Sequence, residues 1–343
     1  MDKASPTFSI VIEWENARMT DAWRTREMLK RLHEQLVEVG QMQPEGHPQP
    51  KIFIPYDKNR IDREMIEKVV GAVSEIESWP ANIQLIPTDG FEYYEQKNLG
   101  AQQSDTDLII FLDSDVSPEQ GWLAGYLEAF QNPDVQVVRG NTYIMTEGLY
   151  SKAMALAWAF PLRGEGFPNT ENDLTQTDGF WANNVAFRRE TFEALGGFPN
   201  MPSFRGQCVA LTQNLKEQGV DIFLQQRSPV AHPAPSARYF VNRALCKGHD
   251  QVINHDLTVR RLRGKSPAHS LVTSSNFVTF SAWNLYGLGR ALTRVARYHR
   301  DVRLGPIGAV AAAGIAASYF ILRFAGAVIT TVRPDFVRRY FPI

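Results

Sequence analysis

The sequence predicts an α/β protein in which a mostly parallel sheet carries helices on both faces. Apolar runs of strand length alternate along most of the chain with amphipathic segments of helix length, an order that favours parallel strands joined by crossover helices. The 343 residues are 44% hydrophobic and 21% charged, a balance typical of folded proteins. This length accommodates one large domain with an appendage, or two domains.

Each predicted element follows from a local pattern in the order in which the chain presents it. Strands are expected where short apolar runs are bounded by polar or turn residues, at 8–12, 51–55, 83–86, 108–112, 135–139 and 222–224. Helices are expected where apolar residues recur near helical spacing, at 21–39, 63–78, 93–103, 121–131, 190–195 and 209–218. Segment 150–162 is expected to form a helix, either in the core or on a membrane surface.

The strand at 108–112 and the residues that end it are the most informative part of the chain. Its apolar run stops abruptly at Asp113-Ser114-Asp115. Two carboxylates separated by one residue, at the carboxyl end of a buried parallel strand, lie where α/β sheets bind ligands. Carboxylate oxygens suit Mg²⁺ or Mn²⁺, and a cation held there would bridge to a diphosphate. The alternative is a solvated turn, because Asp and Ser are common turn residues.

A second copy of the same pattern, Asp105-Thr106-Asp107, precedes this strand. Carboxylates before a parallel strand lie at the opposite edge of the sheet from the one where ligands bind. The second copy is therefore not expected to hold a cation.

Charge is distributed unevenly along the chain. Residues 238–343 contain sixteen Arg or Lys and four Asp or Glu, a balance of +12. Because the net charge of the whole chain is −1, residues 1–237 carry a charge of −13. Such asymmetry indicates a basic segment that meets an anionic surface. Two cysteines are too few for a zinc cluster or a disulfide framework, which fits a reducing compartment. The polar N-terminus has no apolar signal region, so the N-terminal domain is expected in the cytoplasm.

The C-terminal third has the pattern of a membrane-associated segment. Residues 277–300 mix Trp, Tyr and aliphatic side chains with four arginines on one helical face, at 290, 294, 297 and 300. Basic amphipathic helices of this kind are typical of anionic membrane surfaces, although an ordinary solvated helix face gives the same pattern.

Residues 304–332 are almost wholly apolar and exceed the ~20 residues that a spanning helix needs. The exception is Arg323, which falls near the far end of a helix that starts at Pro306 and can reach the interface there. Basic residues flank both ends, so the orientation stays open. A spanning helix, a helix lying on the membrane and a re-entrant hairpin broken near Gly314 or Gly326 are the alternatives.

Taken together, the motifs resemble those of the family 2 glycosyltransferases, which have the GT-A fold. The resemblance covers about residues 8–235, and the order and spacing of the segments make it more specific than any one of them. The matching segments are Ser9-Ile10-Val11-Ile12 for the opening strand, Asp57 after the second strand, Gln96-Lys97-Asn98-Leu99-Gly100, Phe111-Leu112-Asp113-Ser114-Asp115, residues 184–190, Gly196-Gly197-Phe198-Pro199 and His232.

This resemblance implies a division of the chain and a role for each matched residue. Residues 1–235 would form the GT-A domain, 236–303 a basic amphipathic interfacial segment, and 304–343 an apolar membrane segment with a basic tail. The implied roles are donor binding by Asp57, Lys97, Asp113 and Asp115, a Mn²⁺ or Mg²⁺ ion on Asp113, Asp115 and His232, acceptor binding by Trp181, Asn183 and Asn184, and phosphate or lipid binding by Arg238, Arg243 and Lys247.

Each of these residues also has a purely structural interpretation. Asp57 would end a strand in a turn, His232 would be an ordinary histidine, and Trp181 would pack in the core. Lys97 and the three basic residues after His232 would be solvated charges on helices. The sequence leaves both interpretations open.

Two departures from the family pattern affect the expected chemistry. Glu13-Trp14-Glu15-Asn16 stands where the family has Pro-Thr-x-Asn, which alters the nucleoside side of the site. Gln207 and Cys208 stand where the family has a Glu-Asp pair whose Asp is the general base. Cys208 would act only as a thiolate near a cation such as Arg205. Asp178, which directly precedes the acceptor-side block, is the substitute candidate.

The expected function is the metal-dependent transfer of a sugar from a UDP- or GDP-sugar to a lipid-linked or polysaccharide acceptor at the cytoplasmic membrane face, with no nucleic acid partner. A catalytically silent GT-A subunit of a glycan-synthesis complex is the alternative that the missing acidic pair suggests. A nucleotidyltransferase would need a Gly-rich, basic phosphate loop near the first strand, where Glu13-Trp14-Glu15 has the opposite charge. The sugar, the acceptor, the stereochemistry and the oligomeric state stay open.

Overall fold

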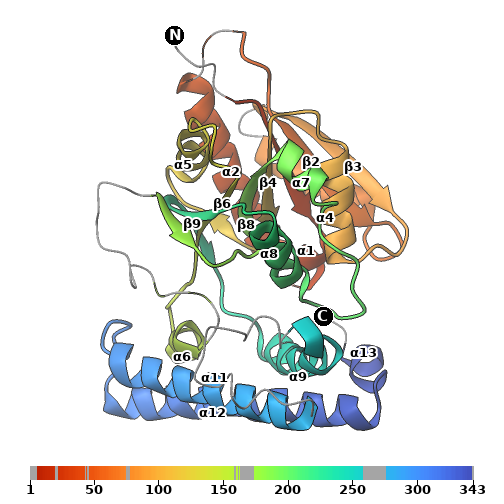
Figure 1. Cartoon of the computed structure of the whole chain (residues 1–343). Coiled ribbons are helices and arrows are strands. Elements are labelled where there is room, and N and C mark those ends of the chain that lie inside the picture. Colours follow the sequence, from red (N-terminus) through yellow and green to blue (C-terminus); the bar gives the residue numbers. More distant parts are fainter. Residues whose placement is uncertain are drawn as a thin grey trace. The chain divides into compact units, whose positions relative to one another are not determined.

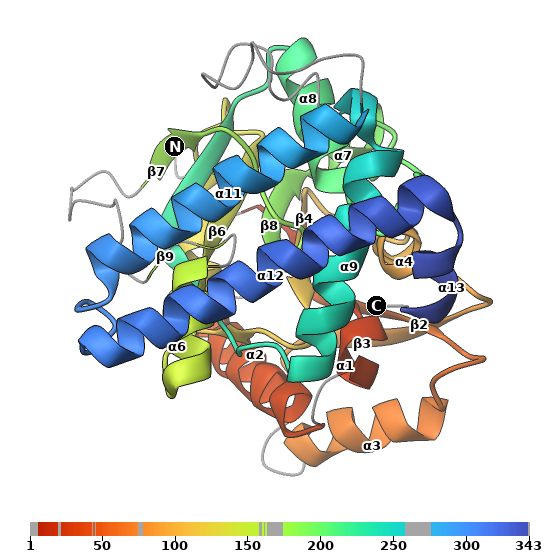
Figure 2. The same ribbon diagram turned by 90° about the horizontal axis from the view of Figure 1, so that it is seen from below.

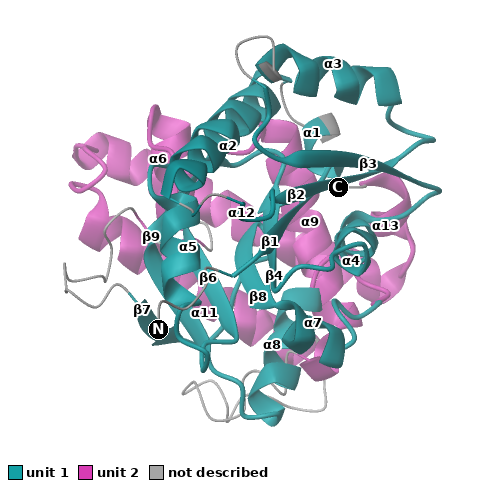
Figure 3. Ribbon diagram, turned by 90° about the horizontal axis from the view of Figure 1, so that it is seen from above, with its two compact units in different colours: residues 1–143, 167–200, 207–232 teal, residues 144–166, 201–206, 233–343 magenta. Residues whose placement is uncertain are grey.

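The computed structural model describes residues 6–19, 22–42, 44, 46–74, 78–157, 160, 162, 174–257 and 276–341. The chain divides into two units, which are coloured separately in Figure 3. Unit 1 comprises Met1–Tyr143, Phe167–Asn200 and Gln207–His232, and unit 2 comprises Ile144–Gly166, Met201–Gly206 and Pro233–Ile343. The two C-terminal segments expected from the sequence, 236–303 and 304–343, therefore belong to one unit.

Unit 1 is built on one mixed sheet (Figure 1). Its strands are β1 (Phe8–Glu13), β2 (Lys51–Asp57), β3 (Asn82–Thr88), β4 (Leu108–Asp113), β5 (Ser117–Pro118), β6 (Val137–Ile144), β7 (Leu174–Thr177), β8 (Asn184–Arg188) and β9 (Ile222–His232). They lie in the order β3-β2-β1-β4-β8-β6-β9-β5, and β7 pairs with β9. Strands β3, β2, β1 and β4 pair in parallel, whereas β8 pairs antiparallel with β4 and β6, and β9 pairs antiparallel with β5 and β7. The predicted α/β class is confirmed, with the antiparallel pairs beyond β4.

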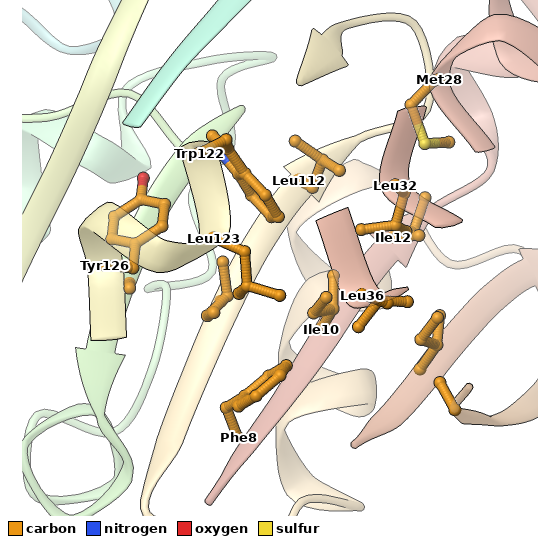
Figure 4. Packing of buried hydrophobic residues seen from close by; sticks show 14 of the residues in the cluster. Phe8, Ile10, Ile12, Met28, Leu32, Leu36, Leu112, Trp122, Leu123 and Tyr126 are labelled. Carbon is orange, nitrogen blue, oxygen red and sulfur yellow. The ribbon is translucent and has the colours of Figure 1, made fainter. Parts of the chain in front are cut away.

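Helices cover both faces of this sheet (Figure 3). They are α1 (Glu15–Met19), α2 (Ala22–Met42), α3 (Arg63–Ser74), α4 (Tyr93–Gln102), α5 (Trp122–Ala129), α7 (Arg189–Ala194) and α8 (Gln207–Glu217). Successive side chains of a strand point to opposite faces. On β1, Ile10 and Ile12 accordingly join a core cluster with residues of α2, α3 and α5, part of which Figure 4 shows. Val11 joins the cluster formed with α4, α7 and α8 on the other face.

Strand β9 is much longer than the sequence suggests. Only 222–224 is apolar enough to read as a strand, yet β9 runs from Ile222 to His232 through the polar segment 225–229. It pairs with β7 near its start and with β5 near its end, so its length is set by its neighbours in the sheet. The same tertiary effect explains β5, β7 and β8, which are too short or too polar to be recognised from their own residues.

Unit 2 is helical in the part of the chain that the structure describes. Its helices are α6 (Leu149–Ala157), α9 (Ala237–Ile253), α11 (Asn276–Tyr298), α12 (Pro306–Val332) and α13 (Phe336–Tyr340). Figure 2 shows α11 and α12 side by side in front of α9. Helix α12 is unbroken over 27 residues, so the expected alternative of a hairpin broken at Gly314 or Gly326 is wrong. Among the described residues it is the one helix long and apolar enough to cross a membrane.

Small residues bring α9 and α12 into close contact. A side chain on Gly248 of α9 would overlap the backbone of Arg323 and Ala327, and one on Gly326 would overlap the backbone of Leu245. Arg323 lies in this contact and is buried, and its Nε donates a hydrogen bond to Gln251 Oε1 at 3.1 Å. The one charged residue of α12 therefore faces the interior of unit 2.

Candidate active site

Three adjacent parallel strands of unit 1 end in carboxylates at one edge of the sheet. They are Asp57 at the end of β2, Glu13 at the end of β1 and Asp113 at the end of β4, and all three are buried. Glu13 and Asp113 are direct partners in the register of the two strands. Sequence analysis identified both aspartates but missed Glu13, although its position at the end of the first strand was a usable signal.

Asp113 is engaged through both of its carboxylate oxygens. Lys97 Nζ lies 2.8 Å from Oδ1, which also accepts a hydrogen bond of 2.5 Å from the Tyr93 hydroxyl. Asn16 Nδ2 donates to Oδ2 at 3.0 Å. Tyr93 and Lys97 reach the same carboxylate because residues four apart share one face of α4. Lys97, predicted to face the ribose or diphosphate, is fully buried with its ammonium group over the Tyr93 ring.

Glu13 is a buried carboxyl group beside this ion pair. Its Oε2 accepts a hydrogen bond from the Asn16 backbone N–H at 3.1 Å, while Oε1 is buried without a hydrogen-bond partner. Burial raises the pKa of Glu13 well above its ordinary value, and the neighbouring charge of Asp113 raises it further. Glu13 therefore keeps its proton to a higher pH than a free glutamate does.

Asp57 stabilises the turn that follows β2. Its Oδ1 accepts hydrogen bonds from the backbone N–H groups of Asn59 and Gly90, at 3.0 and 3.2 Å. Its Oδ2 lies 3.2 Å from Arg60 Nε, and the same guanidinium contacts Glu15 Oε1 at 3.0 Å. These contacts fit the turn interpretation of Asp57, and a role in binding the donor stays a prediction.

Asp115 and His232 come together through pairing within the sheet. Asp115 follows β4, and His232 ends β9, whose residue Ala231 pairs with Ser117 of β5. Asp115 Oδ2 lies 4.0 Å from His232 Nε2, too far for a hydrogen bond. Asp115 Oδ1 is buried without a hydrogen-bond partner, and burial raises the pKa of this carboxyl group.

These atoms fit a cation that is shared with a bound ligand. A buried carboxylate oxygen without a partner is the acceptor that a divalent cation would satisfy, and imidazole suits Mn²⁺ better than Mg²⁺. Asp113, which was predicted as a third ligand, is instead held by Lys97, Tyr93 and Asn16. No group of three or more His, Cys, Asp or Glu side chains is placed to hold a metal within the described residues. A metal site on Asp113, Asp115 and His232 stays a prediction, in which Asp115 and His232 are the two side chains not held by Lys97.

Asn184, predicted to bind the acceptor, is bonded within the core. Its Oδ1 accepts hydrogen bonds from Trp122 Nε1 at 2.8 Å and from the Tyr126 hydroxyl at 2.7 Å. Its Nδ2 donates to the Ser228 carbonyl at 3.1 Å. The amide thus joins α5 and β9 to the start of β8, and this structural role accounts for an Asn at a buried strand position.

Of the other two acceptor-side residues, Asn183 borders Asp113. The Asn183 carbonyl accepts a hydrogen bond from the Asp113 backbone N–H at 3.2 Å, and Asn183 Oδ1 accepts one from Thr142 Oγ1 at 3.4 Å. Trp181 stacks under the guanidinium of Arg139, which lies 4.6 Å from the ring centre. Burial lowers the pKa of Arg139 to about 10. An acceptor role for Trp181 and Asn183 stays a prediction.

The two candidate bases lie in different surroundings. Cys208 is the second residue of α8, and its Sγ lies 3.3 Å from the hydroxyl of Tyr94, whose ring packs against that of Tyr93. Cys208 is thereby linked to the contacts of Asp113.

Asp178 is different, because its side chain is 83% exposed and pairs with Lys216 Nζ at 3.1 Å. The preceding residue, Thr177, pairs with Ile222, ten residues before His232 along β9. That is about 30 Å at 3.3 Å per residue. The structure therefore does not bring Asp178 to the edge that carries Asp115 and His232.

The basic residues predicted to bind phosphate or lipid all lie on α9 in unit 2. Arg243 and Lys247 are four residues apart and share a helix face, whereas Arg238 is exposed on a different one. Their binding role stays a prediction.

Comparison with known proteins assigns part of unit 1 to a family. Residues 62–196 match the model of the family described as glycosyl transferase family 2. Residues 62–196 therefore carry a glycosyltransferase family 2 domain. The match includes Asp113 and Asp115 and ends before Cys208 and His232.

Two known proteins are similar to about half of the chain. The O-antigen biosynthesis protein RfbC of Myxococcus xanthus is 27% identical over 177 residues, which are 48% of this chain and 14% of that protein. The pre-mycofactocin glycosyltransferase of Mycobacterium tuberculosis is 28% identical over 203 residues, which are 58% of this chain and 41% of that protein. The chain thus spans less than half the length of either relative, and the family 2 model and the name of the second relative indicate a transferase enzyme.

A solved structure extends the likeness to most of the chain. A mannosyltransferase from Pyrobaculum calidifontis, in complex with GDP-Man and Mn²⁺, matches with a TM-score of 0.55. The alignment covers 97% of this chain and 89% of that one at 15% identity. At this identity the likeness concerns the fold, and the family 2 domain has the GT-A fold.

Proposed function

We propose that the chain transfers a sugar from a nucleotide-diphospho-sugar to a lipid-linked or polysaccharide acceptor at the cytoplasmic face of a membrane. The observation that carries this proposal is the buried, unpartnered Oδ1 of Asp115 beside His232 at the carboxyl end of β4. A divalent cation bound to these two side chains would supply positive charge to the departing diphosphate.

Lys97 has a defined electrostatic task in this proposal. A diphosphate is an anion, and the strand ends that it would meet carry four buried carboxyl groups, those of Asp57, Glu13, Asp113 and Asp115. The ammonium group 2.8 Å from Asp113 offsets that carboxylate, and the raised pKa of Glu13 favours its neutral form. Both effects reduce repulsion of the donor. Asp115, beside His232, would then hold the cation, whose positive charge would offset the burial that raises the pKa of Asp115.

The transfer itself needs a base for the acceptor. The acceptor oxygen bonds to the anomeric carbon as the bond from that carbon to the diphosphate oxygen breaks. The diphosphate leaves with the electron pair, and the hydroxyl proton passes to the base. Cys208 supports this role better than Asp178 because it lies at the N-terminus of an 11-residue helix, a position that favours a thiolate.

Membrane location and a lipid-linked acceptor are supported by unit 2. Helix α12 has the length and hydropathy of a membrane helix, and the surrounding C-terminal third is strongly basic. An enzyme held at a membrane meets acceptors that are themselves anchored in lipid.

A second function is favoured by one specific observation. Gln207 and Cys208 replace the acidic pair of the family, so no carboxylate is present at the position of the usual base. A catalytically silent domain that binds nucleotide-sugars as a subunit of a larger complex would keep Asp115 and His232 and need no base.

Paired variants of the two Asp-x-Asp copies test the proposal. Purified full-length chain is titrated with UDP and GDP in the presence of Mn²⁺, and nucleotide release is followed with a panel of UDP- and GDP-sugars. Asp115→Asn is expected to weaken Mn²⁺-dependent binding at least tenfold and to abolish release. Asp105→Asn, in the exposed copy paired with Lys51, is the matched control and should behave like the wild type.

The outcomes separate the two functions. Mn²⁺-dependent binding without release of nucleotide from any sugar supports the silent subunit. Equal binding by the wild type and Asp115→Asn contradicts both.

A further inference from the structure

Helix α12 exposes a continuous apolar stripe along its whole length. Positions 307, 314, 321 and 328 recur every seven residues and therefore lie along one side of the helix. Ile307 is 88% exposed and Ile321 is 67% exposed. The stripe consists of Ile307, Val310, Gly314, Ile321, Val328 and Val332, all exposed and none charged. At 1.5 Å per residue the 27-residue helix presents this stripe over about 40 Å.

Helix α11 adds a second line of the same kind. Val278, Leu285 and Leu292 also recur every seven residues and are exposed, Leu285 by 69%. Helices α11 and α12 lie side by side, and both are in front of α9 in Figure 2, so their outer sides belong to one side of unit 2. We call the six stripe residues of α12 and these three residues the α11–α12 face.

The opposite side of α12 is packed against charged protein. Its buried residues include Ala316, Phe320 and Arg323, and α9 contacts it closely through Gly248. Around this contact α9 carries Lys247 and Asp250, and Asp250 accepts hydrogen bonds from two backbone N–H groups within unit 2. If α12 crossed a bilayer in this packing, these charged groups would be carried into the hydrocarbon, which is unfavourable. The packing is compatible with a helix that lies in the plane of the membrane with one side in lipid.

The charges around the α11–α12 face indicate what kind of partner it would bind. Residues 276–340 contain nine arginines, no lysine and two aspartates. Arg303 lies three residues before α12 and Arg333 directly follows it, and both are exposed. Arg290 and Arg297 are exposed on α11. An apolar surface with arginines at its ends matches the boundary between acyl chains and anionic headgroups, whereas a second copy of the chain would present the same positive charge.

We propose that the α11–α12 face docks in the plane of a bilayer rich in anionic lipids, with the apolar stripe among the acyl chains and the flanking arginines on the headgroups. The chain is thereby attached to one leaflet and does not cross the membrane. This attachment is independent of the sugar chemistry, because vesicle binding is measured without donor or acceptor.

Flotation with vesicles tests the docking surface. The full-length chain is mixed with vesicles of phosphatidylcholine alone, or with vesicles that also contain the anionic lipid phosphatidylglycerol. Binding to the anionic vesicles is expected to exceed binding to neutral ones at least tenfold and to fall as salt is raised. Ile321→Glu and Leu285→Glu should each reduce it at least fivefold. Met42→Glu, at an exposed apolar position of α2 in unit 1, is the matched control and should bind like the wild type.

Several outcomes overturn the docking proposal. Both variants are expected to fold, because the two side chains are exposed and should tolerate the change. Circular dichroism checks this. Folded variants that bind like the wild type would exclude the face as the docking surface. Equal binding to neutral and anionic vesicles would exclude the role of the arginines. Dimers in solution that Ile321→Glu dissociates would assign the face to a second copy instead.

Depth measurements distinguish in-plane docking from spanning. Spin labels are attached to Ile307→Cys, Ile321→Cys and Val332→Cys in a Cys208→Ser background, and their accessibility to oxygen and to a water-soluble nickel complex is compared. In-plane docking places all three labels at one shallow depth, within about 10 Å of the headgroups. A central label near the bilayer midplane with both end labels near water would show a spanning helix and overturn the proposal.

Discussion

Lys97 Nζ lies 2.8 Å from Asp113 Oδ1 in a pair from which solvent is almost excluded. Removing one partner of a buried ion pair leaves an uncompensated charge. Lys97→Met is therefore expected to lower the free energy of unfolding by about 3–5 kcal/mol, measured by urea denaturation. Adding Asp113→Asn should recover most of this loss, because the double variant buries no unpaired charge. A Lys97→Met variant as stable as the wild type would show that the pair is solvated.

Glu13 should make stability fall as the pH rises. Its pKa is raised in the folded state, so between its ordinary value of 4.5 and the folded value the unfolded chain binds fewer protons than the folded one. Unfolding is then favoured by increasing pH across that window. Glu13→Gln removes this pH-dependent contribution to the free energy of unfolding. It should raise the melting temperature more at pH 8 than at pH 5, by roughly 2–4 °C for each kcal/mol gained in the free energy of unfolding. The prediction is wrong if the gain is the same at both pH values.

Asn184→Ala should affect stability and leave acceptor recognition intact. The substitution removes the partner of Trp122 Nε1 and of the Tyr126 hydroxyl, both of which are buried. Each buried donor without a partner costs about 1–3 kcal/mol, so the variant should unfold at a clearly lower urea concentration. An Asn184→Ala variant with native stability and a raised acceptor KM would instead support the acceptor role expected from the sequence.

The two base candidates can be separated by substitution. Cys208→Ala is expected to lower kcat by about 10²–10⁴-fold with little effect on nucleotide binding, because general base catalysis contributes about that much. Asp178→Asn should leave kcat near the wild-type value, since its carboxylate is exposed and pairs with Lys216. The reverse pattern of activities would identify Asp178 as the base.

Sequence patterns identified the parts of the fold that depend on local residues. The buried strands ending at Glu13, Asp57 and Asp113 were recognisable because each is a short apolar run at the edge of a βα repeat. Strands β5, β7 and β8 were not, since pairing with neighbours distant in the sequence decides their conformation.

In the candidate site, too, features set by local residues were predictable and features set by tertiary packing were not. The position of Asp115 followed from its strand, whereas the capture of Asp113 by Lys97, Tyr93 and Asn16 depends on how α4 packs on the sheet. The saturation of the Asn184 amide likewise depends on Trp122, Tyr126 and Ser228, which come from other elements. Spacing within one segment carries no information on such partners.

The glycine contacts between α9 and α12 have a practical consequence for handling the protein. Deleting the chain from residue 306 onward, a usual way to make a membrane-bound protein soluble, would uncover the side of α9 that holds Leu245, Gly248 and Gln251. Helix α12 is thus no removable anchor but an integral part of unit 2, and a shortened chain should aggregate. Mild detergent or replacement of exposed stripe residues is the better route to a soluble, folded form.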